Sequence, residues 1–168
     1  YLLQILNDVL DFSKLDADRL EIEHVEFQPR RSVTTTIDLL MSRAKAKGLL
    51  LTATVHEQVP ETVIGDPARV RQVLFNLVGN AIKFTQQGGV TLRLRYAREM
   101  AQLEVVDTGP GMTQEDLDRI FEPFTRGATA AAGSAGSGLG LTIAKMLTDL
   151  MGGELSATST PGVGSVFR

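Results

Sequence analysis

Apolar side chains recur at alternating spacings of three and four over the start of the chain. This spacing places them on one face of an amphipathic helix, formed by Leu2, Ile5, Val9 and Phe12. Three further leucines widen that face: Leu6, Leu10 and Leu15. Because a lone helix cannot bury such a face, we expect it to pack against helices from a neighbouring molecule or from sequence outside this chain.

Beyond residue 20 the pattern switches between a period of two, typical of strands, and a period near 3.6, typical of helices. Strands are predicted at residues 21–29, 49–57, 63–66, 90–98, 101–107, 153–160 and 164–168. Helices are predicted at residues 29–46, 67–84, 113–121 and 140–153. The strands predicted at residues 90–98 and 101–107 are separated by a short turn, which predicts an antiparallel hairpin. The mixture predicts an α+β fold in which helices cover one face of a single sheet.

Residues with strong positional preferences mark the helix boundaries. Pro29 and Pro67 suit the first turn of a helix, and Asp66 is placed to cap the second of these helices. Gly48 follows the end of the helix that begins at Pro29.

Composition narrows the function classes. The chain has 168 residues, enough for one domain and an appendage, and its net charge of −3 is not that of a nucleic-acid-binding protein. It has no Cys, which excludes disulfides, Cys-based zinc sites and thiol nucleophiles. No apolar run approaches the ~18 residues of a membrane span. Because the chain lacks an initial Met and stops within a predicted strand, we treat it as an excerpt with a truncated last strand.

A narrow polar stripe runs along the helix predicted at residues 67–84. Asn76, Asn80 and Lys83 are spaced by four and three, and Gln72 and Arg69 continue the stripe backwards. These side chains could simply face water, but Asn is a poor helix former and apolar neighbours indicate an embedded helix. An amide oxygen is a hard ligand suited to Mg²⁺, and a lysine is a point charge for phosphate.

Two glycine-containing stretches add further candidate chemistry. In VVDTGPGM, Asp107 lies at the end of a predicted strand beside two glycines. Its carboxylate can accept a hydrogen bond from the amine of a nucleotide base. The alternative is that Asp107 is an ordinary aspartate of a turn. In GSAGSGLGLT glycines precede a helix start, where free N–H groups can bind an anion; the alternative is a flexible linker. Neither a Rossmann fingerprint nor a P-loop is present, because Leu141 replaces the third glycine and no Gly-Lys-Ser/Thr follows.

Together these motifs describe a nucleotide pocket, and they closely resemble the catalytic, ATP-binding domain of bacterial sensor histidine kinases. The wider family includes gyrase, chaperone and mismatch-repair ATPases. The stretch RQVLFNLVGNAIKFT resembles the family's asparagine box, and IFEPF resembles its phenylalanine box. DTGPGM and GSGLGL resemble its two main glycine boxes, and GVGSVF resembles the small terminal one. The resemblance covers essentially the whole chain. It implies a Bergerat-type fold, a two-layer sandwich of a mixed, mostly antiparallel sheet covered on one face by helices and preceded by one amphipathic helix.

The resemblance implies a role for each matching residue, with ATP and Mg²⁺ as cofactors. Asn80 would ligate Mg²⁺, Asn76 would help to bind phosphates, and the catalytic pair would be Lys83 on the phosphate chain and Arg126 at the terminal phosphate. Phe84 would pack against the adenine. The remaining nucleotide-binding residues would be Asp107 at the adenine amine, Gly109, Gly111, Met112, Phe121, and then Gly136, Ser137, Gly138, Leu139, Gly140 and Leu141 at the phosphates. Residues 127–137 would form a mobile lid, because no large apolar side chain orders them.

The resemblance divides the chain at residue 20. Residues 1–20 resemble the C-terminal part of the second dimerisation and phosphotransfer helix, and residues 21–168 the catalytic domain. The family's acceptor motif, a histidine followed by an acidic residue and then arginine or threonine-proline, is absent. His24 and His56 both lie on predicted strands, and although Glu57 follows His56, neither the arginine nor the threonine-proline comes after it. The implied partners are an acceptor-histidine hairpin, a response regulator or receiver domain, and a second copy that dimerises through the first helix. The implied location is the cytoplasmic part of a membrane-anchored bacterial sensor.

Three other functions remain open on sequence. A gyrase-type hydrolytic ATPase would carry a Glu where this chain has Asn76, which cannot act as a general base. A regulatory nucleotide-binding domain without transfer activity would keep the same boxes. An aspartic protease shares the triplet Asp107-Thr108-Gly109, but it needs two such Asp residues and leaves Asn80 and Lys83 unexplained.

Overall fold

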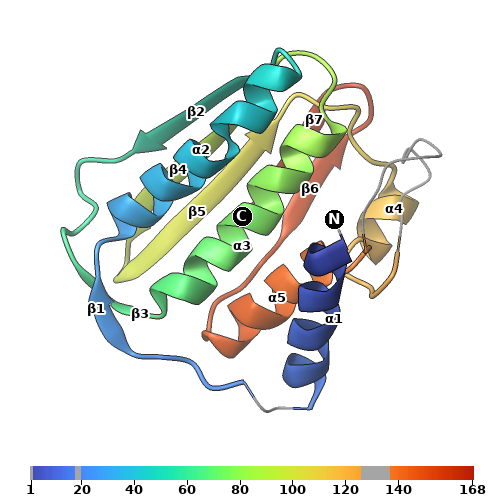
Figure 1. The fold of residues 1–168 in the computed structure, drawn as a ribbon. Coiled ribbons are helices and arrows are strands. Elements are labelled where there is room, and N and C mark those ends of the chain that lie inside the picture. The colour runs from blue at the N-terminus through green and yellow to red at the C-terminus, as the bar shows by residue number, and fades with distance from the viewer. Residues whose placement is uncertain (1, 18–19, 126–136) are drawn as a thin grey trace.

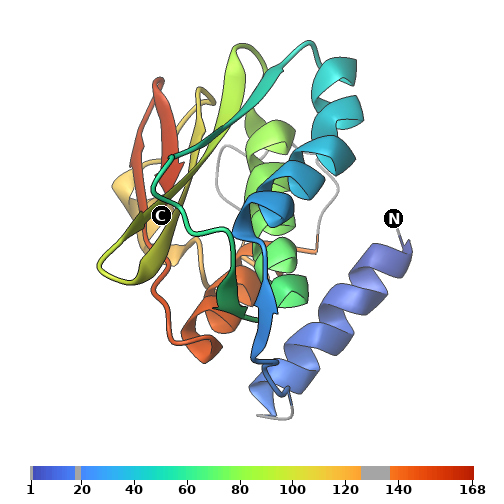
Figure 2. The ribbon, with the colours of Figure 1, turned by 90° about the vertical axis from the view of Figure 1, so that its left-hand side faces the viewer.

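The structure, a computed structural model, describes residues 2–17, 20–125 and 137–168. Three helices lie side by side on one face of a five-stranded sheet (Figure 1; Figure 2). They are α2 (Pro29–Ala46), α3 (Pro67–Phe84) and α5 (Gly140–Leu150). Two further helices lie outside this layer: the opening helix α1 (Leu2–Asp16) and the short α4 (Gln114–Arg119). The predicted α+β, two-layer architecture is therefore confirmed.

The sheet is mixed and mostly antiparallel, as predicted. Its strand order is β2-β4-β5-β7-β6; β2 and β4 run parallel, and every other neighbouring pair is antiparallel. The strands are β2 (Leu50–Val55), β4 (Gly89–Ala97), β5 (Met100–Asp107), β6 (Ala157–Thr160) and β7 (Gly164–Phe167). A separate antiparallel pair consists of β1 (Val25–Phe27) and β3 (Val63–Gly65), so the prediction of a single sheet is wrong for these two strands.

Alternation along β4 explains why only one face of the sheet takes helices. Leu92 and Leu94 are fully buried beneath the helix layer. Arg93, between them, projects from the opposite face and pairs with Glu104 of β5 at 3.2 Å. Because successive side chains of a strand point to opposite faces, the apolar residues bury themselves only where a helix covers them.

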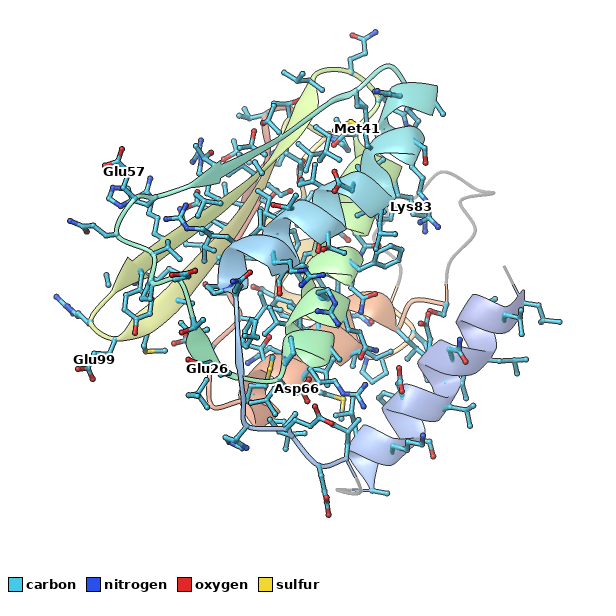
Figure 3. The ribbon with its side chains drawn as sticks, turned by 60° about the vertical axis from the view of Figure 1, so that its left-hand side comes forward. Glu26, Met41, Glu57, Asp66, Lys83 and Glu99 are labelled. Carbon is cyan, nitrogen blue, oxygen red and sulfur yellow. The ribbon has the colours of Figure 1, made fainter. Side chains whose placement is uncertain are left out.

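Helix α3 carries the predicted polar stripe and begins where the sequence indicates. The Asp66 carboxylate caps it by accepting from the backbone N–H of Arg69 at 3.0 Å. Its apolar face is in the core, where Leu74 and Val78 are both 0% exposed. Figure 3 shows Asp66 at the first end of α3 and Lys83 near the other. The register of this helix therefore determines which way its amides point.

Several strands are shorter than predicted, and the two histidines lie outside them. His24 immediately precedes β1, and His56 immediately follows β2, although its backbone N–H still donates to the Leu94 carbonyl at 2.9 Å. β6 begins at Ala157 rather than at residue 153. The Gly153 N–H instead donates to the Thr148 carbonyl at 2.9 Å, so it belongs to the turn that ends α5.

Helix α1 packs on its own domain, although its apolar face was predicted to find its partners outside this chain. Leu15 joins the hydrophobic core, and the Phe12 ring meets the Phe124 ring edge-on with centroids 6.2 Å apart. The expectation that Phe12 belongs to a face without a partner in this chain is thus wrong, because α1 lies along α5. The exposed part of this apolar face is formed by Leu2, Leu6, Val9 and Leu10, and Leu3 beside it is exposed as well.

We expect Leu74→Ala to lower the free energy of unfolding by about 2–5 kcal/mol, because the side chain leaves a cavity between α3 and the sheet. Urea unfolding followed by circular dichroism measures the change. Leu39→Ala, at a position 62% exposed on α2, is the control and should shift it by less than about 0.5 kcal/mol. Equal losses in the two variants would contradict this placement of the core.

Candidate nucleotide site

The polar stripe of α3 faces the start of α5. A Cβ placed on Gly140 would lie 3.8 Å from the amide oxygen of Asn76 and 4.0 Å from the amide nitrogen of Asn80. Both asparagines are partly buried, so neither simply faces solvent. The structure therefore brings together the asparagines and the second glycine stretch, which the sequence separates by sixty residues.

The start of α5 presents backbone donors at this point. Its N-cap residue is Leu139, whose side chain makes no capping hydrogen bond, and the backbone N–H of Leu139 itself donates to the Ser137 hydroxyl at 3.2 Å. Leu139 is fully buried, while the small Gly140 leaves the first turn open on the side of the asparagines. An uncapped first turn offers N–H groups and a positive dipole end to an anion.

The loop before α5 is closed at its base by a backbone contact. The Phe124 N–H donates to the Gly138 carbonyl at 3.1 Å, and Gly138 has a positive φ of 72°. A Cβ on Gly138 would lie 3.1 Å from the Phe124 backbone, so glycine is required there. Ser137 donates its hydroxyl hydrogen to the carboxylate of Asp8 on α1 at 2.7 Å.

Two predicted site residues fall outside the described part of the chain. They are Arg126 and Gly136, and the predicted lid, residues 127–137, also lies outside it except for Ser137. These predictions therefore stay predictions.

The carboxylate of Asp107 lies at the end of β5 in a partly buried setting. Its Oδ1 accepts from the Gly109 N–H at 2.8 Å. Burial raises the pKa of Asp107 above its ordinary value of 3.8, and the backbone N–H groups of Gly109 and Ser165 act in the opposite direction. The carboxylate therefore sits where a ligand amine can reach an acceptor shielded from water.

Thr85, which sequence reasoning missed, lies beside this carboxylate. A Cβ on Gly109 would lie 2.8 Å from Asp107 Oδ1 and 3.1 Å from Thr85 Oγ1, so Gly109 leaves both oxygens room. Thr85 is 0% exposed, and within the described part of the chain its hydroxyl has no hydrogen-bond partner. A buried hydroxyl without a partner is costly, and a bound polar ligand would relieve that cost. The available signal was its position directly after the polar helix.

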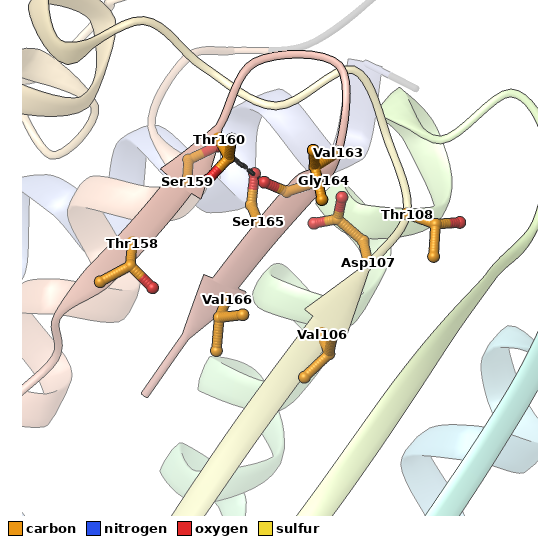
Figure 4. A pocket seen from close by; sticks show the side chains of 10 residues that line it. All are labelled: Val106, Asp107, Thr108, Thr158, Ser159, Thr160, Val163, Gly164, Ser165 and Val166. Atoms are coloured by element: carbon orange, nitrogen blue, oxygen red, sulfur yellow. Dashed lines mark hydrogen bonds between the residues drawn. The ribbon is translucent and has the colours of Figure 1, made fainter.

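A cavity of about 300 Å³ adjoins Asp107 on the side of the β6–β7 hairpin (Figure 4). Among the predicted site residues that the structure describes, only Asp107 lines it. Ser159 and Ser165 contribute hydroxyls 2.9 Å apart, and the Ser159 hydroxyl also accepts from the Met112 N–H at 2.8 Å. The sequence motif GVGSVF marked this hairpin and contains Ser165, but sequence reasoning assigned no role to either serine. The cavity is thus an extension of the Asp107 side of the site, separate from the asparagines.

Other predicted residues lie near the two ends of the site. The Lys83 ammonium stands 4.9 Å from the centroid of the Phe84 ring, which is partly exposed. Gly111 has a φ of 68°, and a Cβ there would overlap the Thr160 carbonyl oxygen.

Phe121 and Leu141 contribute to packing. The Phe121 ring meets the Phe167 ring edge-on at 6.4 Å, and Leu141 is partly buried against the core. Phe121 therefore lies beside the last strand of the sheet, and Leu141 adds apolar contact at the start of α5.

The donor set fits a magnesium–phosphate group better than a protein-only metal site. No group of three acidic or histidine side chains comes together within residues 2–17, 20–125 and 137–168. The amide oxygen of Asn80 can instead supply one ligand while phosphates and water supply the rest, in keeping with the few protein ligands that Mg²⁺ takes at phosphate sites. The arrangement offers a metal and phosphate end, between α3 and α5, and a base end at Asp107.

Comparison with known proteins gives concordant findings. A profile of the family described as histidine kinase-, DNA gyrase B-, and HSP90-like ATPase matches residues 65–168. The sensor protein TorS of Escherichia coli (strain K12) is 42% identical over 168 residues, covering 99% of this chain and 18% of TorS. The signal transduction histidine-protein kinase BarA of the same strain is 41% identical over 172 residues, covering 99% and 19%. The chain thus spans about a fifth of the length of these curated relatives.

A solved structure is similar over the same extent. The crystal structure of full-length ShkA in complex with AMPPNP matches with a TM-score of 0.88 and 34% identity. The match covers 99% of this chain and 34% of ShkA. It therefore includes α1 as well as the sheet and its helices.

We expect the acid dependence of stability to report the burial of Asp107. Because its folded-state pKa is raised, the native protein binds more protons than the unfolded chain between pH 3.8 and that pKa. Relative to Asp107→Asn, the wild-type free energy of unfolding should fall as pH rises through this window and then level off. Urea unfolding of both proteins from about pH 4 to about pH 7 measures it. Asp38→Asn, exposed on α2, controls for loss of one carboxylate; parallel curves for wild type and Asp107→Asn would exclude a buried carboxylate.

Proposed function

The chain belongs to the histidine kinase-, DNA gyrase B- and HSP90-like ATPase family, and we propose that it is the ATP-binding catalytic domain of a two-component sensor histidine kinase. It transfers the terminal phosphate of Mg-ATP to a histidine on a helical hairpin that this chain does not complete. The observation that carries the proposal is the convergence of Asn76 and Asn80 on the uncapped start of α5. A metal ligand beside backbone donors for phosphate is the combination that the phosphate end of Mg-ATP requires.

At the phosphate end, this chain's residues bind and orient. Asn80 supplies an amide oxygen to Mg²⁺, Asn76 donates to the phosphates, and Lys83 places a positive charge along the phosphate chain. The bound metal supplies charge neutralisation at the transferred phosphate. The residues proposed to close over the phosphates are Gly136, Ser137, Gly138, Leu139, Gly140 and Leu141, with Arg126 at the terminal phosphate.

At the base end, Asp107 accepts a hydrogen bond from the adenine amine, and Gly109 and Gly111 allow the close approach. The unpartnered Thr85 hydroxyl and the Ser165 backbone lie beside the same carboxylate and support a polar base edge at this point. The apolar contacts to the base are assigned to Phe84, Met112 and Phe121. Purine selection then follows from matching a carboxylate acceptor to an amine donor.

Transfer is favoured over hydrolysis because this chain has an amide at the position where hydrolytic relatives would carry their general base. Asn76 occupies the position where the gyrase-type enzymes carry a glutamate, and an amide cannot take a proton. Family membership also excludes the aspartic protease alternative. A regulatory domain that binds nucleotide without transferring phosphate remains the second candidate, since it requires the same binding residues.

The exposed apolar face of α1 supports a division of the chain into this helix and the domain that follows it. We assign residues 1–20 to the second helix of a dimerisation and phosphotransfer hairpin and residues 21–168 to the catalytic domain. The partners proposed on this basis are the acceptor hairpin, a second copy paired through α1, and a response regulator or receiver domain. Among the described residues, no helix is long and apolar enough to cross a membrane. A cytoplasmic position in a membrane-anchored bacterial sensor is a proposal from the resemblance to sensor kinases.

We expect Asn80→Ala to weaken ADP binding at least about tenfold when Mg²⁺ is present and much less without it, because one metal ligand is lost. Isothermal titration calorimetry in magnesium and in EDTA measures both affinities. Asn7→Ala on the exposed side of α1 is the matched control and should bind as wild type does. Identical magnesium dependence in wild type and Asn80→Ala would remove the metal assignment.

We expect this chain alone to acquire no phosphate from labelled ATP, because neither histidine lies in an acceptor context. Mixed with a folded hairpin that carries the parent protein's acceptor histidine, it should transfer label slowly, giving an acid-labile and base-stable product. At roughly 10 µM hairpin the rate should be about 100-fold below that of the tethered protein, whose effective concentration is about 1 mM.

Three outcomes of this experiment discriminate between the candidates. Label on the chain alone would refute the missing acceptor. Steady release of phosphate without hairpin would favour hydrolysis. Tight ATP binding with no transfer to a folded hairpin would favour the regulatory domain. Asn80→Ala serves as the inactive control in each case.

A further inference from the structure

The last turn of α3 ends in backbone carbonyls that a helix cannot satisfy by itself. Three carbonyl oxygens near this end accept hydrogen bonds from one ammonium, that of Lys47. The distances from Lys47 Nζ are 2.7 Å to the Ile82 oxygen, 2.8 Å to the Lys83 oxygen and 2.7 Å to the Thr85 oxygen. An ammonium has three N–H donors and no acceptor, so its hydrogen-bonding capacity matches this set. The positive charge also lies at the negative end of the helix dipole.

Lys47 is itself held by a hydrogen-bonded turn. It is the C-cap residue of α2, and its backbone N–H donates to the Ala44 carbonyl at 3.1 Å. The same carbonyl accepts from the N–H of Leu49, which is buried, and the Leu50 N–H donates to the Gly88 carbonyl at 3.0 Å. The side chain therefore extends from a fixed point between α2 and the sheet.

The segment that Lys47 binds carries both ends of the candidate site. Asn80 and Lys83 lie on the last turn of α3, at the metal and phosphate end. Thr85, whose carbonyl Lys47 also binds, places its hydroxyl beside Gly109 and Asp107 at the base end. A displacement of this turn would therefore move the two ends of the site together.

We propose that Lys47 is a positioning residue for nucleotide binding: its ammonium fixes the C-terminal turn of α3 so that Asn80, Lys83 and Thr85 face the ligand together. The inference rests on the proposed nucleotide site and deepens it. Lys47 acts through α3 and contributes no atom to the ligand. Partial burial lowers the pKa of Lys47 from 10.5, because desolvation disfavours the charged ammonium.

The test compares variants that remove or reshape this ammonium. Lys47→Met keeps the length of the side chain and removes its donors, and because Lys47 is exposed overall no core cavity is created. Lys47→Arg keeps the charge but spreads its donors over a planar fork that cannot converge on three oxygens. Lys45→Met removes an exposed lysine from the same helix end and is the matched control.

Affinity is measured at about 15 °C, well below unfolding, so that loss of stability alone leaves the dissociation constant unchanged. For Mg-ADP we expect Lys47→Met to bind about 10- to 100-fold more weakly than wild type, Lys47→Arg to be intermediate, and Lys45→Met to equal wild type. The side-chain amide resonances of Asn80 should shift in Lys47→Met and not in Lys45→Met.

The outcomes are separable from those of the proposed function. If wild type binds no Mg-ADP, the proposed function fails together with this inference. If wild type binds and Lys47→Met binds within twofold of Lys45→Met, only the positioning role is overturned, even where the melting temperature falls. If Lys47→Met does not fold, Lys47→Arg decides: weaker binding with unchanged circular dichroism supports the proposal, and wild-type affinity overturns it.

Discussion

The packing of α3 on the sheet, between α2 and α5, is the constraint on which the rest of the structure depends. Leu74 and Val78 are wholly buried, so the rotation of the helix about its axis is set by the core. Asn76 and Asn80 lie on the other side of the same turns and are thereby directed at the start of α5. A rotation of α3 that moved the amides would also expose apolar surface. The hydrophobic core therefore determines the geometry of a polar site.

Close approach between backbone and polar side chains is the second feature of the site. At Gly140 the absence of a side chain leaves the α5 start open to Asn76, and at Gly109 it leaves room for the oxygens of Asp107 and Thr85. Larger residues would fill the space that a phosphate or a base requires. The same property makes the site dependent on its scaffold, because glycine supplies no packing of its own. The three hydrogen bonds from Lys47 to carbonyl oxygens at the end of α3 are consistent with this need for support from the scaffold.

Helix α1 combines two kinds of surface. Toward the domain, Asp11 accepts from the Gln72 side-chain amide at 2.7 Å and Asp8 accepts from the Ser137 hydroxyl at 2.7 Å. These contacts connect α1 to α3 and to the loop before α5, the two elements that form the phosphate end. Away from the domain, its exposed leucines remain available for other helices. Helix α1 is thus in contact with the site while leaving much of its apolar stripe uncovered.

The sequence by itself determined the features that depend on neighbouring residues. The span of α3 follows from the Asp66 cap and helical periodicity, and the β4–β5 hairpin follows from alternation and a short turn. The amide stripe could be predicted for the same reason, since residues four apart on a helix share a face. Only the tertiary structure decided what lies opposite: the Thr85 hydroxyl beside Asp107, and the Lys47 ammonium on carbonyls at least 35 residues away. Such contacts arise when separate elements bury their apolar faces against one another, and no local pattern encodes which polar groups that burial brings together.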